Sequence, residues 1–66
     1  MDIKDVMKSR REALQLSQQD LAEMATVSLA TIKDIERGKG NPSLSTVQKI
    51  LEVFGMEIEY KVRQTI

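Results

Sequence analysis

Two short helix-like patterns lie almost end to end in the stretch LSQQDLAEMATVSLATIKDIERGK. The first predicts a helix over Gln18–Met24 and the second a helix over Leu29–Arg37. The residues Ala25-Thr26-Val27 are the main separation between them. Two helices joined so closely must cross steeply, so the first can brace the second while the second protrudes. This constraint limits the range of possible folds more than any other feature of the chain.

The ends of these two helices carry their own signals. Ser17 with Asp20 has the spacing of a capping box, in which each residue satisfies a backbone N–H of the other. Ser28 is an N-cap candidate for the second helix, and Gly38 is the C-terminal glycine expected to end it.

Three further elements complete the predicted chain. Apolar residues at helical spacing predict a helix over Ile3–Leu14, with Asp2 as its cap, and another over Ser45–Phe54, stopped by Gly55. The period then changes from 3.6 to 2. Apolar and charged residues alternate through Met56–Arg63, which predicts a β-strand with one apolar face.

We therefore expect an all-α, compact domain of four to five helices with a C-terminal β-strand. Residues 1–55 would form the helical domain and residues 56–66 a separate strand and tail. The predicted core consists of the inward apolar positions Met7, Leu14, Leu21, Ala25, Val27, Ile32, Ile35, Leu44, Val47, Ile50, Leu51 and Phe54.

Composition excludes several functions. The chain of 66 residues has no cysteine and no histidine, so it lacks thiolate and imidazole ligands for a metal and the commonest general base. An enzyme would need a carboxylate pair in a pocket, but the acidic residues read as caps and surface charges. We expect no catalytic site, metal or cofactor. With no membrane-length apolar run and no signal peptide, we expect a cytoplasmic protein.

The chain resembles the phage lambda-type repressor and Cro family of helix-turn-helix regulators, also called the XRE family. The resemblance covers about Met7–Gly55 and implies a lambda repressor-like DNA-binding domain, with the second helix of the pair in the major groove of double-stranded DNA. The residues that carry it are Arg11, Leu16-Ser17-Gln18, Asp20-Leu21-Ala22, Val27-Ser28, Thr31-Ile32, Ile35-Glu36, Gly38-Lys39, Pro42-Ser43-Leu44 and Val47.

The resemblance assigns roles to residues. Base contacts fall on Ser28, Leu29, Ala30 and Lys33, and phosphate contacts on Arg10, Gln18, Thr31, Arg37, Lys39, Asn41 and Ser43. Lys33 could reach guanine or a phosphate, whereas Leu29 and Ala30 offer only apolar contact, for instance with thymine methyl groups. Several assignments have open alternatives. Gln18 could be a simple polar residue at a helix start, and some of the other phosphate candidates could be solvated surface residues. Leu29 lies three residues before Ile32 and could join the core instead, and Thr31 could simply face solvent.

Two further pairs of positions follow from the same resemblance. Arg11 and Glu36 occupy positions where the family forms a structural ion pair between the first helix and the end of the third. Gln15 and Thr26 stand where the family usually has glycine in a left-handed backbone. Since a β-branched residue disfavours that conformation, either the turn around Thr26 is reshaped or the strain is accepted.

The last segment predicts a partner. A single strand has nothing to pair with in its own chain, so the apolar face formed by Met56, Ile58, Tyr60 and Val62 is expected to form a homodimer interface. The ending FGMEIEYKVR also resembles HipB-type antitoxins, which repress their own operon and bind a toxin. A sequence-specific repressor that reads a palindromic operator as a homodimer is thus expected. It would be an autoregulating antitoxin, a stand-alone phage or plasmid regulator, or a restriction controller. The alternative is a helix-turn-helix scaffold that binds only proteins.

Overall fold

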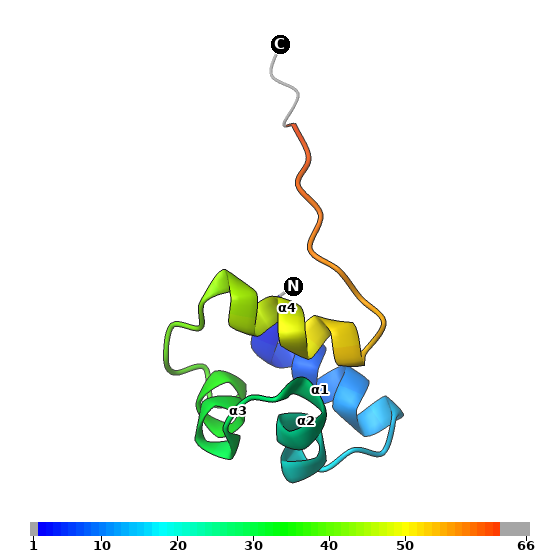
Figure 1. Cartoon of the computed structure of the whole chain (residues 1–66), viewed down its shortest axis with the longest axis vertical. Coiled ribbons are helices and arrows are strands. Elements are labelled where there is room, and N and C mark those ends of the chain that lie inside the picture. Colours follow the sequence, from blue (N-terminus) through cyan, green and yellow to red (C-terminus); the bar gives the residue numbers. More distant parts are fainter. Residues whose placement is uncertain (1, 63–66) are drawn as a thin grey trace.

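The computed structural model describes residues 2–62 and contains four helices within that range (Figure 1). They are α1 (Ile3–Ala13), α2 (Gln18–Ala25), α3 (Leu29–Glu36) and α4 (Leu44–Val53). Each lies within one residue of its predicted bounds, so the all-α fold with four helices is confirmed. No helix in this part of the chain is long and apolar enough to cross a membrane.

Serine side chains begin three of the helices. The Ser17 hydroxyl accepts from the N–H of Asp20 at 2.9 Å while Asp20 accepts from the N–H of Ser17 at 3.0 Å, as the capping box predicted. The bonds from Ser17 lower the pKa of the Asp20 carboxyl. The hydroxyls of Ser28 and Ser43 cap α3 and α4 by accepting from the N–H groups of Thr31 and Thr46. Asp2 precedes α1 as predicted, but its side chain makes no capping hydrogen bond to the described chain, which corrects that detail.

All four helices end in one motif, with a residue in the left-handed conformation just beyond the last turn. The residues are Gln15, Thr26, Gly38 and Gly55. After α3, for example, the N–H of Gly38 donates to the carbonyl of Ile35 and the N–H of Lys39 to that of Asp34, which is the Schellman pattern. Thr26 has φ 57° and ψ 45°, so the turn keeps the left-handed geometry and accepts the strain.

The core comprises the buried apolar residues Met7, Leu21, Ala22, Ala25, Ile32, Ile35, Ile50, Leu51 and Phe54. Val27 and Val47 are half-buried against it. Two predicted core residues are wrong, because Leu14 is 45% exposed and Leu44 is 50% exposed. Leu14 follows the last turn of α1 and Leu44 is the first residue of α4, so both lie at helix ends where no other helix covers them.

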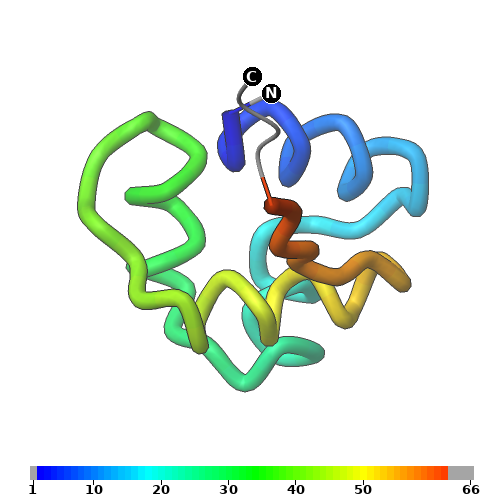
Figure 2. Tube along the Cα trace, turned by 90° about the horizontal axis from the view of Figure 1, so that it is seen from above, coloured from blue at the N-terminus to red at the C-terminus, as the bar shows by residue number. Residues whose placement is uncertain are grey.

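The helices pack so that α3 is supported from behind. Within residues 2–62, α1 and α2 both pack against α3, and α2 also packs against α4. The loop between α3 and α4 lies at the edge of the molecule in both views (Figures 1 and 2). One side of α3 therefore faces the core while the other side is left uncovered.

The predicted C-terminal strand is absent from a single chain. No strand occurs in residues 2–62, and Met56–Val62 runs away from the helical body on the side opposite α2 and α3 (Figure 1). Figure 2 views this segment nearly end-on. Ile58 packs against the core, whereas Tyr60 is 77% and Val62 98% exposed. Arg63, the last residue of the predicted strand, lies outside the described residues. A strand needs a neighbouring strand to form hydrogen bonds with, and residues 2–62 provide none.

Candidate nucleic-acid interface

The turn between α2 and α3 fixes the angle at which α3 leaves α2. The N–H of Val27 donates to the carbonyl of Ala22 at 3.0 Å and the N–H of Thr26 to that of Glu23 at 3.3 Å. These bonds satisfy carbonyls that the end of α2 would otherwise leave free. Because Val27 also packs against the core, the chain has little freedom before α3 begins at Leu29.

The first turn of α3 is organised by its cap. The Ser28 hydroxyl accepts from the N–H of Thr31 at 3.1 Å and shares a hydrogen bond with the Thr31 hydroxyl at 2.8 Å. Ser28, Ala30 and Lys33 are exposed, whereas Thr31 and Leu29 are half-buried. Leu29 packs against the core, in line with its spacing to Ile32. The uncovered surface at the start of α3 is thus made mostly by Ser28, Ala30 and Lys33.

The other end of α3 is anchored by a buried carboxylate. Glu36 is only 3% exposed and accepts two hydrogen bonds from Arg11, each of 2.9 Å, in a bidentate ion pair. Arg11 also donates to the carbonyl of Leu16 at 3.0 Å, and Gln18 donates to Glu36 at 3.3 Å. The pKa of Arg11 is raised, mainly by its hydrogen bond to Glu36. Residues from α1, α2 and the loop between them therefore converge on the last turn of α3.

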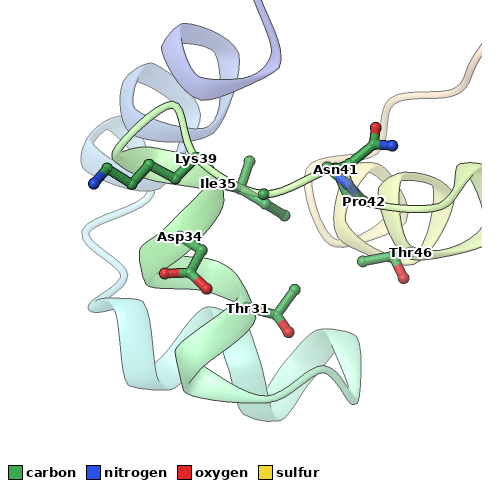
Figure 3. A pocket seen from close by; sticks show the side chains of 8 residues that line it. Thr31, Asp34, Ile35, Lys39, Asn41, Pro42 and Thr46 are labelled. Carbon is green, nitrogen blue, oxygen red and sulfur yellow. The ribbon is translucent and has the colours of Figure 1, made fainter.

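Two hollows flank the uncovered side of α3. The first, of about 360 Å³, lies between α3 and the start of α2 and is lined by Gln18, Ala30, Lys33, Asp34 and Arg37. The second, of about 300 Å³, lies between α3 and the loop that leads to α4 (Figure 3). It is lined by Thr31, Asp34, Ile35, Lys39, Gly40, Asn41, Pro42 and Thr46.

The predicted phosphate-contact residues divide between these two sides. Gln18 and Arg37 line the first hollow, and Thr31, Lys39 and Asn41 line the second. Ser43 follows the second hollow at the start of α4, where its hydroxyl donates to that of Thr46 at 3.0 Å and accepts from the N–H of Thr46 at 3.1 Å. Arg10 is exposed on α1 and lines neither hollow, so the geometry does not group it with the others.

One residue that the sequence prediction left out occupies the middle of this surface. Asp34 lines both hollows, and it forms an ion pair with Arg37 one turn further along α3. Helical spacing could have found it, since Ala30, Asp34 and Arg37 stand at i, i+4 and i+7 along one side of the helix. The sequence prediction did not name it, because DNA contacts were assigned only to positions taken from the family resemblance.

A braced helix with an uncovered surface, preceded by a three-residue turn and a supporting helix, defines the class of helix-turn-helix DNA-binding domains. The helix-turn-helix family profile matches residues 7–61 of the chain, which is most of its length. The chain thus belongs to the helix-turn-helix family of lambda repressor/Cro-like, or XRE-type, regulators.

Sequence relatives agree with this family. The chain is 44% identical over 57 residues to an uncharacterized HTH-type transcriptional regulator of Methanocaldococcus jannaschii, with 86% of each chain covered. It is 40% identical over 53 residues to an uncharacterized HTH-type transcriptional regulator of Archaeoglobus fulgidus, which covers 80% of this chain and 75% of the relative. It is also 36% identical over 58 residues to the immunity repressor protein of Bacillus phage phi105, covering 88% of this chain but 40% of the repressor.

These relatives support DNA-binding transcriptional regulation as the general role of the chain. The family is one of transcriptional regulators and not of enzymes.

Proposed function

We propose that the protein is a sequence-specific transcriptional repressor that binds its operator as a homodimer, with α3 of each copy in the major groove. The single observation that carries this proposal is the placement of α3 between two hollows bordered by cationic and polar side chains. A helix in the major groove has a phosphate backbone on each side, and side chains on both sides of α3 supply cationic and polar groups for such contacts.

Base contacts in this arrangement come from the first turns of α3. Lys33 is exposed and carries only hydrogen-bond donors, which suits the O6 and N7 acceptors of guanine. Ala30 is exposed and can contact a thymine methyl group, while half-buried Leu29 can do so only with the part of its side chain outside the core. Ser28 already uses its hydroxyl in the cap, so a base contact would draw on its remaining hydrogen-bonding capacity.

Phosphate contacts come from both sides of α3. On one side Gln18 stands at the start of α2 with Arg37 nearby, and Gln18 also bonds Glu36, so a phosphate there would be linked to the brace of α3. On the other side Lys39, Asn41 and Ser43 precede α4. The first N–H groups of α4 add a positive helix end there.

Dimer formation is proposed through Met56–Val62. This segment carries exposed apolar side chains at Met56, Tyr60 and Val62, and it leaves the helical body away from α2 and α3. A second copy could cover these side chains and pair with the exposed backbone, since two extended segments packed against helices are stable where one is not. Association there leaves both α3 surfaces free for DNA.

The proposed symmetry predicts the shape of the operator. Two α3 helices related by a two-fold axis read two inverted half-sites, whose centres lie roughly 34 Å apart, about one turn of DNA. Residues 1–55 would then supply DNA binding and residues 56–66 the association of the two copies.

The test of sequence-specific binding is a selection from a randomised DNA library, followed by binding of the selected duplex at low and high salt. We expect an enriched palindrome whose affinity falls with salt, by about 0.9 in log–log slope for each phosphate neutralised. Failure to enrich any motif, together with salt-independent binding, would contradict the proposal and favour the protein-binding scaffold.

The test of the dimer uses Tyr60→Asp, because Tyr60 is largely exposed in the single chain and its loss should leave the monomer folded. We expect the variant to sediment as a monomer and to bind the palindrome more weakly. Glu12→Gln, a charge change at an exposed position on α1 outside Met56–Val62, is the control and should remain dimeric. A Tyr60→Asp protein that stays dimeric and binds the operator normally would rule out this interface.

A toxin partner stays a prediction. The three relatives described above are named as regulators or repressors, and those names do not include a toxin. The same exposed segment would be the surface to examine if a toxin were encoded beside this protein.

A further inference from the structure

An acidic side chain stands in the middle of the surface proposed to face DNA. Asp34 is placed on the outward side of α3 and lines the hollows on both flanks of that helix, so it lies between the two groups of phosphate-binding candidates. Figure 3 shows it on α3, across from Asn41 and Thr46. A side chain between the two phosphate backbones faces the floor of the major groove, where the base edges are.

The ion pair with Arg37 reduces the repulsion between this carboxylate and the DNA phosphates. Its Nη2 donates to Oδ1 of Asp34, so the two charges offset each other locally. The Asp34 side chain is still 47% exposed, and within residues 2–62 its second oxygen, Oδ2, has no hydrogen-bond donor. Arg37 uses only Nη2 in this pair and keeps its other N–H groups for a phosphate. Asp34 is therefore held through one oxygen, while the other remains able to accept a hydrogen bond.

The chemistry of that free oxygen limits what it can read. A carboxylate only accepts hydrogen bonds, and the major groove offers donors on the N4 amino group of cytosine and the N6 amino group of adenine. Adenine presents its N7 acceptor beside N6, which would repel the carboxylate, whereas cytosine has no acceptor there. Guanine and thymine offer no donor in this groove.

We propose that Asp34 is a specificity-determining residue that selects a cytosine in each half-site of the operator. This inference rests on the proposed function, since it assumes that α3 enters the major groove. It also gives the neighbouring Lys33 a partner: the guanine that pairs with this cytosine, or that of the adjacent pair, presents the acceptors that Lys33 needs. The half-site then contains at least one C·G pair read by side chains of opposite charge.

The test is a library selection with the wild-type protein and three variants, Asp34→Ala, Asp34→Asn and Glu52→Gln. The Glu52 variant removes the same charge from an exposed position on α4, away from both hollows. We expect the wild type and the control to enrich the same cytosine. Asp34→Ala should lose the preference at that position alone, and Asp34→Asn should shift it toward adenine, which an amide can bond at both N6 and N7.

Binding to defined duplexes gives the size of the effect. Replacing the selected cytosine pair by a thymine pair should weaken wild-type binding about five- to tenfold, the low end for a contact made by one acceptor, and should leave Asp34→Ala unaffected. If Asp34→Ala enriches the wild-type motif and binds every sequence more tightly, Asp34 is only a repelling charge and the assignment falls. A wild-type protein that enriches no motif would overturn the proposed function, and this assignment with it.

Discussion

Replacing Thr26 by glycine should stabilise the protein. Thr26 adopts φ 57° and ψ 45°, the left-handed conformation that costs a residue with a Cβ roughly 1–2 kcal/mol. Glycine removes that cost but adds about 0.5–1 kcal/mol of backbone entropy to be lost on folding. The Thr26 side chain is exposed, so little packing is sacrificed. The net gain is about 0.5–1 kcal/mol, which for a domain of this size raises the melting temperature by about 2–8 °C.

The assay is urea denaturation followed by circular dichroism, at one protein concentration so that association does not shift the result. The urea concentration at the midpoint of unfolding should rise, while the slope of the unfolding free energy against urea concentration should stay constant. Thr26→Ala is the matched control, because it removes the hydroxyl and the branch but keeps the Cβ, and it should fall below the glycine variant by about 1 kcal/mol. Equal stability of the glycine and alanine variants would show that the left-handed turn stores no strain and would refute the reasoning.

Three further predictions test the core, the brace and the interface. Ile35→Ala, a truncation at a buried position, should lower the free energy of unfolding by about 2–5 kcal/mol; in urea denaturation, a loss under about 1 kcal/mol would contradict the inward assignment. Arg11→Ala leaves the buried carboxylate it pairs with uncompensated and should cost about 3–5 kcal/mol by the same assay, whereas a purely surface pair would cost under about 1 kcal/mol. In library selection, Lys33→Ala should change the enriched motif, while Lys39→Ala should weaken binding to all sequences and reduce the salt slope by about 0.9. The same motif from Lys33→Ala and wild type would make Lys33 a phosphate contact.

Local signals in the sequence were sufficient for the helices and most of their ends. The capping box at Ser17, the cap at Ser28 and the terminating glycine at Gly38 all involve residues within a few positions of one another, so the sequence contains both partners. The inward stripe of α3, with Ile32 and Ile35, follows from helical spacing alone.

Positions at helix ends were harder to predict. Leu14 and Leu44 fit the apolar spacing, but burial there depends on whether another segment covers the end, and none does among the described residues. Asp2 has the right type and place for a cap, yet its side chain makes no capping hydrogen bond. For the two leucines, tertiary surroundings, which the local pattern does not contain, decided the outcome.

In the candidate site too, local sequence predicted some features, while tertiary packing determined others. Periodicity placed α3, but which side chain of α3 receives the hydrogen bond from Gln18 depends on how α2 packs, and the helical period does not contain that information. Asp34 was missed because contacts were assigned position by position from the family resemblance, whereas its place beside Arg37 is seen only in the folded helix. The strand predicted at Met56–Arg63 is not found among the described residues, because alternating apolar and charged residues predict an apolar face but supply no neighbouring strand for Met56–Val62 to pair with.

The most direct measurement of the central claim, that α3 and its flanks bind DNA, is a titration of the isotope-labelled protein with its selected duplex, followed by amide chemical shifts. We predict the largest changes at Gln18, along 28–34 in α3 and at 39–46, with small changes at the outer side of α1 and in Met56–Val62. Changes confined to Met56–Val62, with α3 unaffected by DNA, would contradict the account.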